Sequence, residues 1–420
     1  MTGVSELLSD LREGLSVVRG NVLVLTVTWM LFNPVFTMIM IYEPLYIEEL
    51  GGSGLVIGLI YAVGTVILSL VRIPGGYLAD RFGRKKITVV FTFGVGFAYL
   101  FYAFAPDWRW ILIGAMVANV SLIYQPALNA LIADSVPPER RGFAFSMTAF
   151  LPGLVSLPMP VFADYLRSSY GLVGGVRIIY LIAVTAGLAS AFIRHVYLKE
   201  TLTRDGGQES PEGIWSGFRQ DYREAVAFVS KGLIPVLALY ALFSFGASGV
   251  SPFFPIYTVG FLGLPEGEWY LVPLASRVVF LAFLLPMGVL ADRMGRRRTI
   301  VMASSTLLLS SIIYAFIPPG IGQVLILAVL SFSLLSFAQT AFRTALPALE
   351  ADIVPQEKRG RVWAVITLVA GMAGAAGQLT AGYTYDFVHP TTPFLVLMAA
   401  MTAGTVIAFF SIKEPTEREA

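Results

Sequence analysis

The side chains best suited to chemistry in this chain are the few charged residues that lie within long apolar stretches. Arg277, Arg343 and Glu43 have mainly apolar neighbours on both sides. A charged group in such surroundings needs a counter-charge, a polar ligand or water. Arg277 lies 15 residues before Asp292, about 22 Å along a helix at roughly 1.5 Å per residue. This arginine is therefore predicted to face a polar cavity, a carboxylate or an anionic ligand.

Polar side chains, accompanied in the first case by aromatic and methionine side chains, recur at spacings of three and four residues in four of these apolar stretches. Residues three and four apart share one face of a helix, so each series predicts a helix with one polar face directed away from its apolar surroundings. The series are Trp29, Asn33, Phe36, Met40 and Glu43; Ser121, Gln125 and Asn129; Ser244, Ser248 and Ser251; and Ser333, Ser336, Thr340 and Arg343. From these faces and Arg277 we predict a ligand-binding set of Asn33, Phe36, Met40, Gln125, Ser244, Arg277, Thr340 and Arg343.

Each of these residues also has a structural interpretation. A single Ser or Thr can bond to the carbonyl of the preceding turn of its own helix. Arg343 can form a buried ion pair with Glu350, and Glu43 lies near the end of its apolar stretch, where a carboxylate reaches water. Arg72 directly precedes the loop sequence IPGGYLAD and is interpreted as structural.

The composition indicates a membrane protein. Hydrophobic residues form 56% of the 420 residues and charged residues only 13%, with a mean hydropathy of +0.74, too apolar for the core of one soluble domain of this size. The chain has no cysteine and only two histidines, which excludes thiol chemistry and the clusters that bind metals. We therefore expect no enzyme activity, no catalytic residues, no metal or cofactor, and no nucleic acid as partner.

Twelve segments are long and apolar enough to cross a bilayer, which requires roughly 20 residues each. Of the 29 Lys and Arg residues, 23 belong to one side of the membrane, which the positive-inside rule identifies as the cytoplasm. Both termini of this multi-pass chain are then cytoplasmic and the membrane is the plasma membrane. The twelve segments are 22–46, 54–74, 87–105, 109–132, 142–166, 173–197, 233–260, 269–290, 299–318, 321–347, 360–385 and 391–412.

The spans divide into two halves joined by a polar linker. Residues 1–20 are predicted to form an interfacial helix, because Leu8, Leu11, Leu15 and Val18 share one face. The remaining predicted divisions are an N-terminal six-helix bundle at 21–198, a cytoplasmic linker with an amphipathic helix at 199–231, a C-terminal six-helix bundle at 232–413 and a cytoplasmic tail at 414–420. The fold class is thus an all-α membrane protein with two pseudo-symmetric six-helix bundles.

A repeated loop sequence supports the duplication. GGYLADRFGRKK, which contains Asp80, returns as MGVLADRMGRRR, which contains Asp292, 212 residues later. A second pair, ALNALIADSVPPERRG and ALPALEADIVPQEKRG, repeats at an offset of 218, with Asp134 matching Asp352. Two six-span halves with the loop pattern G-x-L-A-D-R-x-G-R-[KR]-[KR] resemble the major facilitator superfamily over about residues 21–413. Such internal repeats are common in secondary transporters.

The resemblance implies roles for several loop residues. In that family this motif is taken to latch the two halves on the cytoplasmic side while the transporter is open outward. The resemblance therefore implies coupling or gating roles for Asp80, Arg81, Arg84, Arg141, Asp292 and Arg293, to which we add the embedded carboxylate of Glu43.

The resemblance also implies a monomeric secondary active transporter that moves a small organic solute by alternating access, with the lipid bilayer and protons as its other partners. Aromatic and methionine side chains on the inner faces favour efflux of amphipathic, drug-like compounds. Drug/proton antiporters of this family usually have an arginine where this chain has Ala115, and a G-x-x-x-G-P-x-x-G-G run where it has LPGLVSLPMP. The alternatives are uptake or exchange of an organic anion, sugar or other metabolite, and a sensor that binds a solute without moving it.

Overall fold

The computed structural model describes residues 18–137, 140–202, 229 and 233–412, and these residues form helices without strands. Ten helical stretches among them are long and apolar enough to cross a membrane, or eleven when the bent pair Ile234–Ser248 and Phe253–Phe261 counts as one span. One stretch, Arg141–Tyr197, is 57 residues long and is interrupted at Gly171, where φ is 73°. With that stretch counted as two spans, the helices correspond to the twelve predicted segments. The predicted interfacial helix, most of the linker and the tail lie outside the described residues.

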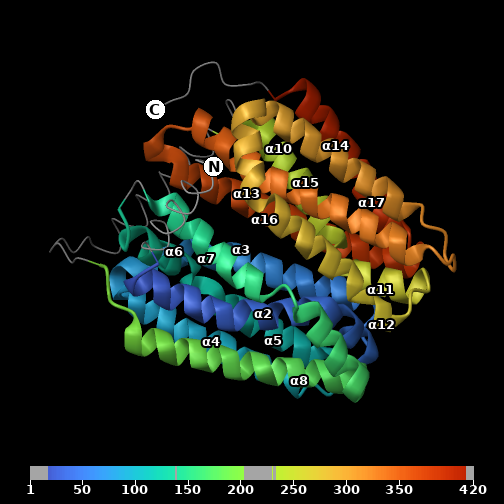
Figure 1. Ribbon diagram of the computed structural model, residues 1–420, viewed down its shortest axis with the longest axis horizontal. Coiled ribbons are helices and arrows are strands. Elements are labelled where there is room, and N and C mark those ends of the chain that lie inside the picture. The colour runs from blue at the N-terminus through green and yellow to red at the C-terminus, as the bar shows by residue number, and fades with distance from the viewer. Residues whose placement is uncertain (1–17, 138–139, 203–228, 230–232, 413–420) are drawn as a thin grey trace, which may run out of the picture. The chain divides into compact units, whose positions relative to one another are not determined.

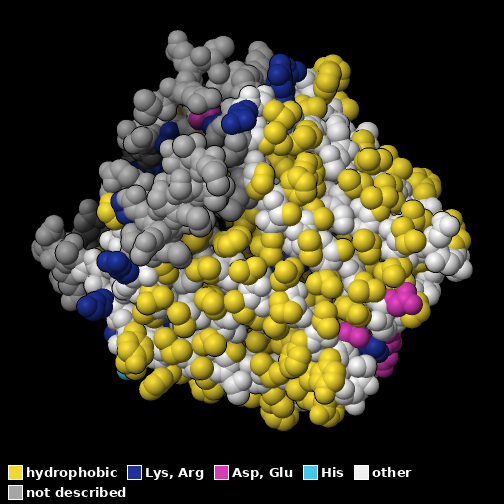
Figure 2. Space-filling model, in the orientation of Figure 1, with side chains coloured by type: hydrophobic (Ala, Val, Ile, Leu, Met, Phe, Trp, Pro, Cys, Tyr) yellow, Lys and Arg dark blue, Asp and Glu magenta, His cyan; other side chains and the backbone are white. Residues whose placement is uncertain are grey.

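The surface agrees with a lipid environment. Hydrophobic side chains cover much of the face drawn in Figure 2, and large ones are widely exposed, among them Phe410 at 75% and Ile326 at 67%. Monomeric soluble proteins rarely expose apolar surface on this scale. The all-α membrane fold predicted from composition is therefore confirmed.

The chain divides into two units of closely packed helices. The first contains residues up to Tyr46 and from Leu70 to Arg204, and the second contains Ile47–Ser69 and the residues from Asp205 onward. Helix α3 belongs to both, because its start lies in the second unit and its end in the first. The predicted bundles at 21–198 and 232–413 therefore remain a prediction from the repeat. The contacts assign the start of α3 and the last three residues of α2 to the second unit instead.

In the first unit α4 packs along both α8 and α5, and Figure 1 shows α4 beside α8. Gly96 of α4 and Gly187 of α8 allow this close approach, since a Cβ on Gly187 would lie 2.8 Å from the Cα of Gly96. The helices of this unit are α2 (Gly20–Glu49), the end of α3 (Gly54–Phe82), α4 (Arg84–Ala103), α5 (Trp108–Ser121), η1 (Leu122–Tyr124), α6 (Gln125–Asp134), α7 (Arg141–Val155) and α8 (Met159–Tyr197).

In the second unit α14 packs against α15 and α17, and α13 packs against α15. Its seventh predicted span is irregular, because α10 continues into the π-helical turn η3 and α11 into the π-helical turn η4. The helices are the start of α3, α10 (Ile234–Phe243), η3 (Ser244–Ser248), α11 (Phe253–Ile256), η4 (Tyr257–Phe261), α12 (Glu266–Trp269), α13 (Leu271–Met294), α14 (Arg296–Ala315), α15 (Val324–Ile353), α16 (Gln356–Phe387) and α17 (Thr392–Phe410).

The repeated loop sequences adopt the same backbone conformation in both units. Gly83 precedes α4 with φ 99°, and Gly295 precedes α14 with φ 92°. L-residues with side chains rarely adopt such angles, which explains the glycine at both positions. The helices that follow are each 20 residues long, so the sequence duplication is also a structural one.

Candidate functional site

Helix α2 carries the predicted ligand-facing series of the first unit. Phe36 and Met40 are 42% and 40% exposed, and Asn33 is half-buried. Glu43, one turn further on, is only 6% exposed and lies near Tyr99 and Tyr102 of α4. The expectation that Glu43 reaches water is therefore wrong, because its side chain is almost fully buried.

Gln125 is held by an arginine that we had interpreted as structural. The Nε and Nη2 atoms of Arg72 on α3 both donate to Oε1 of Gln125 on α6, at 3.1 and 2.9 Å. Arg72 itself is exposed within a membrane-spanning helix, where an arginine is tolerated mainly beside water or a polar partner. The pair thus presents a cationic, hydrogen-bonding surface on the first unit.

In the second unit the polar series of α15 lies against α13. Ser336 donates to the carbonyl of Ser276 at 2.8 Å, which places α15 beside the turn that bears Arg277. Thr340 is 1% exposed and donates to the carbonyl of Ser336 in its own helix. Ser244 is half-buried in the π-helical turn η3, a feature often found at functional sites.

The embedded charges of the second unit are not paired with one another. Arg277 is half-buried, and within the described chain its Nε is buried without a hydrogen-bond partner. Arg343 is exposed and forms no ion pair with Glu350 among the described residues. Glu350 is 4% exposed, and its Oε2 has no partner there. The Arg343–Glu350 ion pair, one structural interpretation of Arg343, is therefore not formed among the described residues.

The first loop motif forms a network at the junction of three helices. Arg84 pairs with Asp134 at the end of α6 and lies 3.7 Å from Asp80 at the end of α3. The carboxylate of Glu200, which follows α8, accepts from the backbone N–H groups of Arg84 and Lys85 at 3.2 and 3.0 Å. A carboxylate at a helix N-terminus satisfies unpaired donors and interacts favourably with the helix dipole.

Two other predicted gating residues make local contacts. Arg81 donates to the hydroxyl of Tyr77 at 2.8 Å, and Arg141 donates from Nε to the carbonyl of Ala133 at 2.9 Å. Arg141 thus satisfies a carbonyl at the C-terminal end of α6, where carbonyls lack partners within the helix.

The second unit repeats these contacts with equivalent residues. Arg296 donates to Asp352 at 3.2 Å, as Arg84 pairs with Asp134. Arg359 donates to the carbonyl of Ala351 at 2.6 Å, as Arg141 does to Ala133. The loop motif predicts Asp292 and Arg293 for this role instead. Arg293 is exposed, and the side chain of Asp292 lies outside the described part. The repeat offsets of 212 and 218 were the signal that identifies Arg296 and Asp352.

The start of α3 is tied to α16 within the second unit. Asp386 accepts from the backbone N–H groups of Gly54 at 2.9 Å and Leu55 at 2.7 Å. Thr65, three turns further along α3, donates to Oε1 of Gln378 at 3.1 Å. These contacts join segments more than 300 residues apart in the sequence.

The described residues contain no group of three or more His, Asp or Glu side chains placed to hold a metal ion.

A family comparison identifies the chain. Residues 21–333 and 275–420 match the model of the Major Facilitator Superfamily. The chain belongs to this superfamily. Major Facilitator Superfamily proteins are transporters of small molecules and are not enzymes, and this one is a multi-pass protein of the plasma membrane.

Two curated relatives are efflux proteins. The Multi-drug resistance efflux pump PmrA homolog of Lactococcus lactis subsp. lactis (strain IL1403) is 26% identical over 366 residues, which cover 83% of this chain and 85% of that protein. The Multidrug resistance protein MdtG of Escherichia coli (strain 55989 / EAEC) is 24% identical over 402 residues, which cover 91% of this chain and 93% of that protein.

Solved structures of the superfamily share the fold. The nucleoside transporter NupG gives a TM-score of 0.71 at 12% identity, covering 94% of this chain and 100% of that chain. A bacterial homologue of the human lysosomal transporter Spinster, in an inward-facing and unoccupied conformation, gives a TM-score of 0.69 at 18% identity. The match covers 93% of this chain and 94% of that chain. At these identities the likeness concerns the fold, and it confirms the fold predicted from the repeat.

Proposed function

We propose that this superfamily member is a secondary active transporter that exports amphipathic organic compounds by alternating access, with protons as the coupling ion and both termini in the cytoplasm. Relatives named as multidrug efflux proteins, which align with most of this chain, support the direction and the substrate class. The basic loops of the sequence support the orientation.

The arrangement of α2 is the observation that carries this proposal. Phe36 and Met40 present apolar side chains that are about two-fifths exposed, and flexible thioether and aromatic groups suit ligands of variable shape. Glu43 lies on the same helix and is buried. An ionised carboxylate at such a position is costly, so protonation of Glu43 is coupled to any movement that changes its exposure.

The loop motif supplies a gating group in this proposal. The side chain of Asp80 is 67% exposed, and its contact with Arg84 is long at 3.7 Å. Asp80 is therefore accessible to a further partner during the transport cycle, whereas Arg84 is held by Asp134. Arg81 and Arg141 brace the loop through their local contacts, and Asp292 and Arg293 take the equivalent positions in the second unit.

A second candidate is uptake or exchange of an organic anion. The unpartnered Nε of Arg277 and the exposed Arg72–Gln125 pair favour it, because both present guanidinium groups inside membrane-spanning helices. A solute sensor is the candidate of a different class, and it predicts binding without movement of the solute.

Transport by reconstituted vesicles tests these proposals. With an imposed pH gradient, the native chain is expected to accumulate a lipophilic cationic dye, and Glu43→Gln is expected to reduce gradient-driven accumulation at least tenfold while dye binding persists. Glu49→Gln is the matched control, since Glu49 is an exposed carboxylate at the end of the same helix.

Gradient-driven accumulation by Glu43→Gln at the native rate would exclude Glu43 as the coupling group. If the native chain accumulates an aromatic carboxylate but no cation, the organic-anion candidate replaces the efflux proposal. Binding by the native chain without accumulation or counterflow of either solute would establish the sensor.

A further inference from the structure

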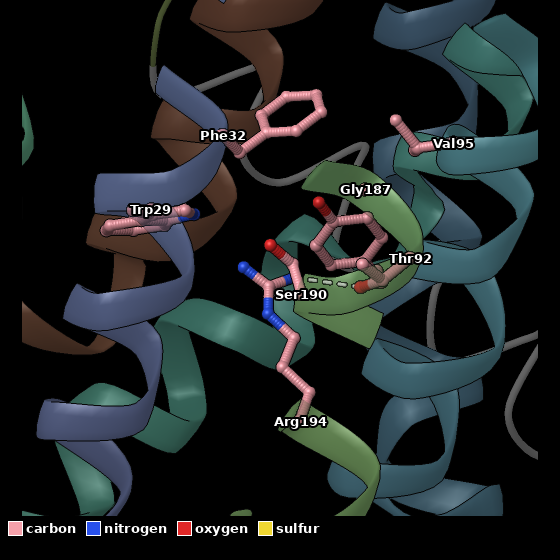
Figure 3. A pocket seen from close by; sticks show the side chains of 8 residues that line it. Trp29, Phe32, Thr92, Val95, Gly187, Ser190 and Arg194 are labelled. Carbon is pink, nitrogen blue, oxygen red and sulfur yellow. Dashed lines mark hydrogen bonds between the residues drawn. The ribbon is translucent and has the colours of Figure 1, made fainter. Parts of the chain in front are cut away.

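Arg194 is a charged side chain buried within the first unit. It lies in the last turn of α8 and is 2% exposed. Its Nε donates to Oγ1 of Thr28 on α2 at 3.0 Å, and its Nη1 donates to Oγ1 of Thr92 on α4 at 2.8 Å. Figure 3 shows the guanidinium group directed toward Thr92 and Ser190, away from the end of the helix.

The contacts of Arg194 leave its charge without a neutralising partner. Both hydrogen-bond acceptors are neutral hydroxyls, and the Tyr124 ring, 5.6 Å from the guanidinium carbon, is neutral too. Among the described residues none of the ion pairs includes Arg194. Arginine cannot release its proton to escape this situation, and burial of an uncompensated charge is unfavourable. A bound negative charge would therefore stabilise the folded unit.

A cavity lies beside this guanidinium group. Its volume is about 20 Å³, which exceeds the roughly 10–15 Å³ that one water molecule requires. Trp29 from α2, Tyr124 from η1 and Ser190 from α8 line it together with Arg194. In Figure 3 the nitrogen-bearing edge of Trp29 faces the side on which the guanidinium lies. The hydrogen bonds to Thr28 and Thr92 use Nε and Nη1. Arginine carries five N–H donors, so others remain for a ligand.

We infer that this cavity binds a monovalent anion, either a halide or the carboxylate group of an organic anion, with Arg194 as its counter-charge. The volume admits only one small charged group, so a larger solute would place only its headgroup there. Because guanidinium is weakly hydrated and the rest of the lining is largely aromatic and aliphatic, weakly hydrated iodide binds more tightly than chloride. The site lies within one unit and is independent of the export proposed above.

Thermal unfolding of the purified full chain in lipid nanodiscs tests this site. At constant ionic strength, chloride or iodide replaces isethionate, which is too large for the cavity and carries no carboxylate. The unfolding midpoint of the native chain is expected to rise with anion concentration and then saturate, with iodide acting at about tenfold lower concentration than chloride. Arg194→Gln is expected to abolish the rise. Arg109→Gln, which removes an arginine that is 71% exposed, is expected to behave as the native chain does.

Repeating the unfolding measurement with benzoate distinguishes an inorganic anion from an organic carboxylate as the ligand. A rise that depends on Arg194 and occurs with halides assigns the cavity to an inorganic anion, and one that occurs with benzoate alone assigns it to an organic carboxylate. Equal responses of the native chain and Arg194→Gln, or no response of the native chain to any of these anions, would overturn the inference.

A second measurement covers the possibility that Arg194→Gln does not fold. Iodide quenches tryptophan fluorescence, and a bound iodide beside Trp29 is expected to add a saturable component that Trp29→Phe removes. Arg194→Lys, which keeps the charge, is expected to retain this component at higher iodide concentration. Strictly linear quenching of the native chain, or a saturable component that persists in Trp29→Phe, would contradict the site.

Discussion

The cap that Asp386 places on α3 allows a quantitative prediction. Its carboxylate accepts both the Gly54 and Leu55 N–H groups, at 2.9 and 2.7 Å, which are donors that the first turn of a helix cannot satisfy itself. Asp386→Ala removes both acceptors. The first turn of α3 is then expected to open more often, because only water remains as a partner for these amides.

The size of this effect follows from the number and type of bonds lost. Replacing a capping Asp by Ala costs typically about 1 kcal/mol and up to about 2 kcal/mol, which corresponds to a roughly fivefold to thirtyfold larger opening equilibrium. Asp386→Asn keeps an acceptor but loses about 0.3–1 kcal/mol of interaction with the helix dipole. It also removes repulsion from Glu48, which lies near Asp386, so its effect is expected to be no more than about fivefold.

Amide hydrogen exchange resolved at residues 52–60 measures this opening, since the exchange rate follows the population of the open form. Asp107→Ala is the matched control, because Asp107 caps α5 by accepting from the N–H of Arg109 at 2.8 Å. That variant is expected to accelerate exchange at the start of α5 and to leave α3 unchanged. Native exchange rates at Gly54 and Leu55 in Asp386→Ala would refute the capping argument.

Two further changes test the packing and the ion pairs of the units. Gly187→Ala would place a Cβ 2.8 Å from the Cα of Gly96, so it is expected to destabilise the first unit by about 1–3 kcal/mol. Gly174→Ala in the same helix is expected to be neutral or stabilising, because its Cβ would meet nothing closer than 3.4 Å. Equal unfolding midpoints for the two variants would contradict this packing argument. Arg296→Met leaves Asp352 without its partner at side-chain exposures of 10% and 18% and is expected to cost about 2 kcal/mol, less than a fully buried pair. The double variant with Asp352→Leu is expected to lose less than the sum of the single variants in a double-mutant cycle, and strict additivity would contradict the pairing.

Much of the fold was predictable because its determinants are local. The spans follow from hydropathy, and the break between the fifth and sixth spans falls at Gly171, within the predicted loop between residues 166 and 173. The duplication was visible in the repeated loops, and Gly83 and Gly295 confirm it with matching positive φ angles. The sequence did not predict the π-helical turns η3 and η4. η3 packs against α16, and Tyr257 of η4 lies against Phe394 of α17, and such long-range contacts leave no local pattern.

The candidate site was less predictable. The series on α2 stays a prediction, and two of its members, Phe36 and Met40, are exposed. Arg194 is not among the predicted site residues, although it lies within the predicted span 173–197. Its burial depends on Thr28 and Thr92, which lie 166 and 102 residues away, and no local pattern contains that information.

The membrane class, the twelve spans and the duplication follow from the sequence alone, because hydropathy, helical spacing and repeated motifs are properties of neighbouring residues. Which charged groups meet depends on the tertiary structure. Arg296 pairs with Asp352 across 56 residues, and Asp386 caps α3 across more than 300. Such pairings depend on which helix ends the packing brings together. The sequence shows only that a charged residue lies in an apolar span, and the free-energy cost of leaving that charge unpaired indicates that it needs a partner.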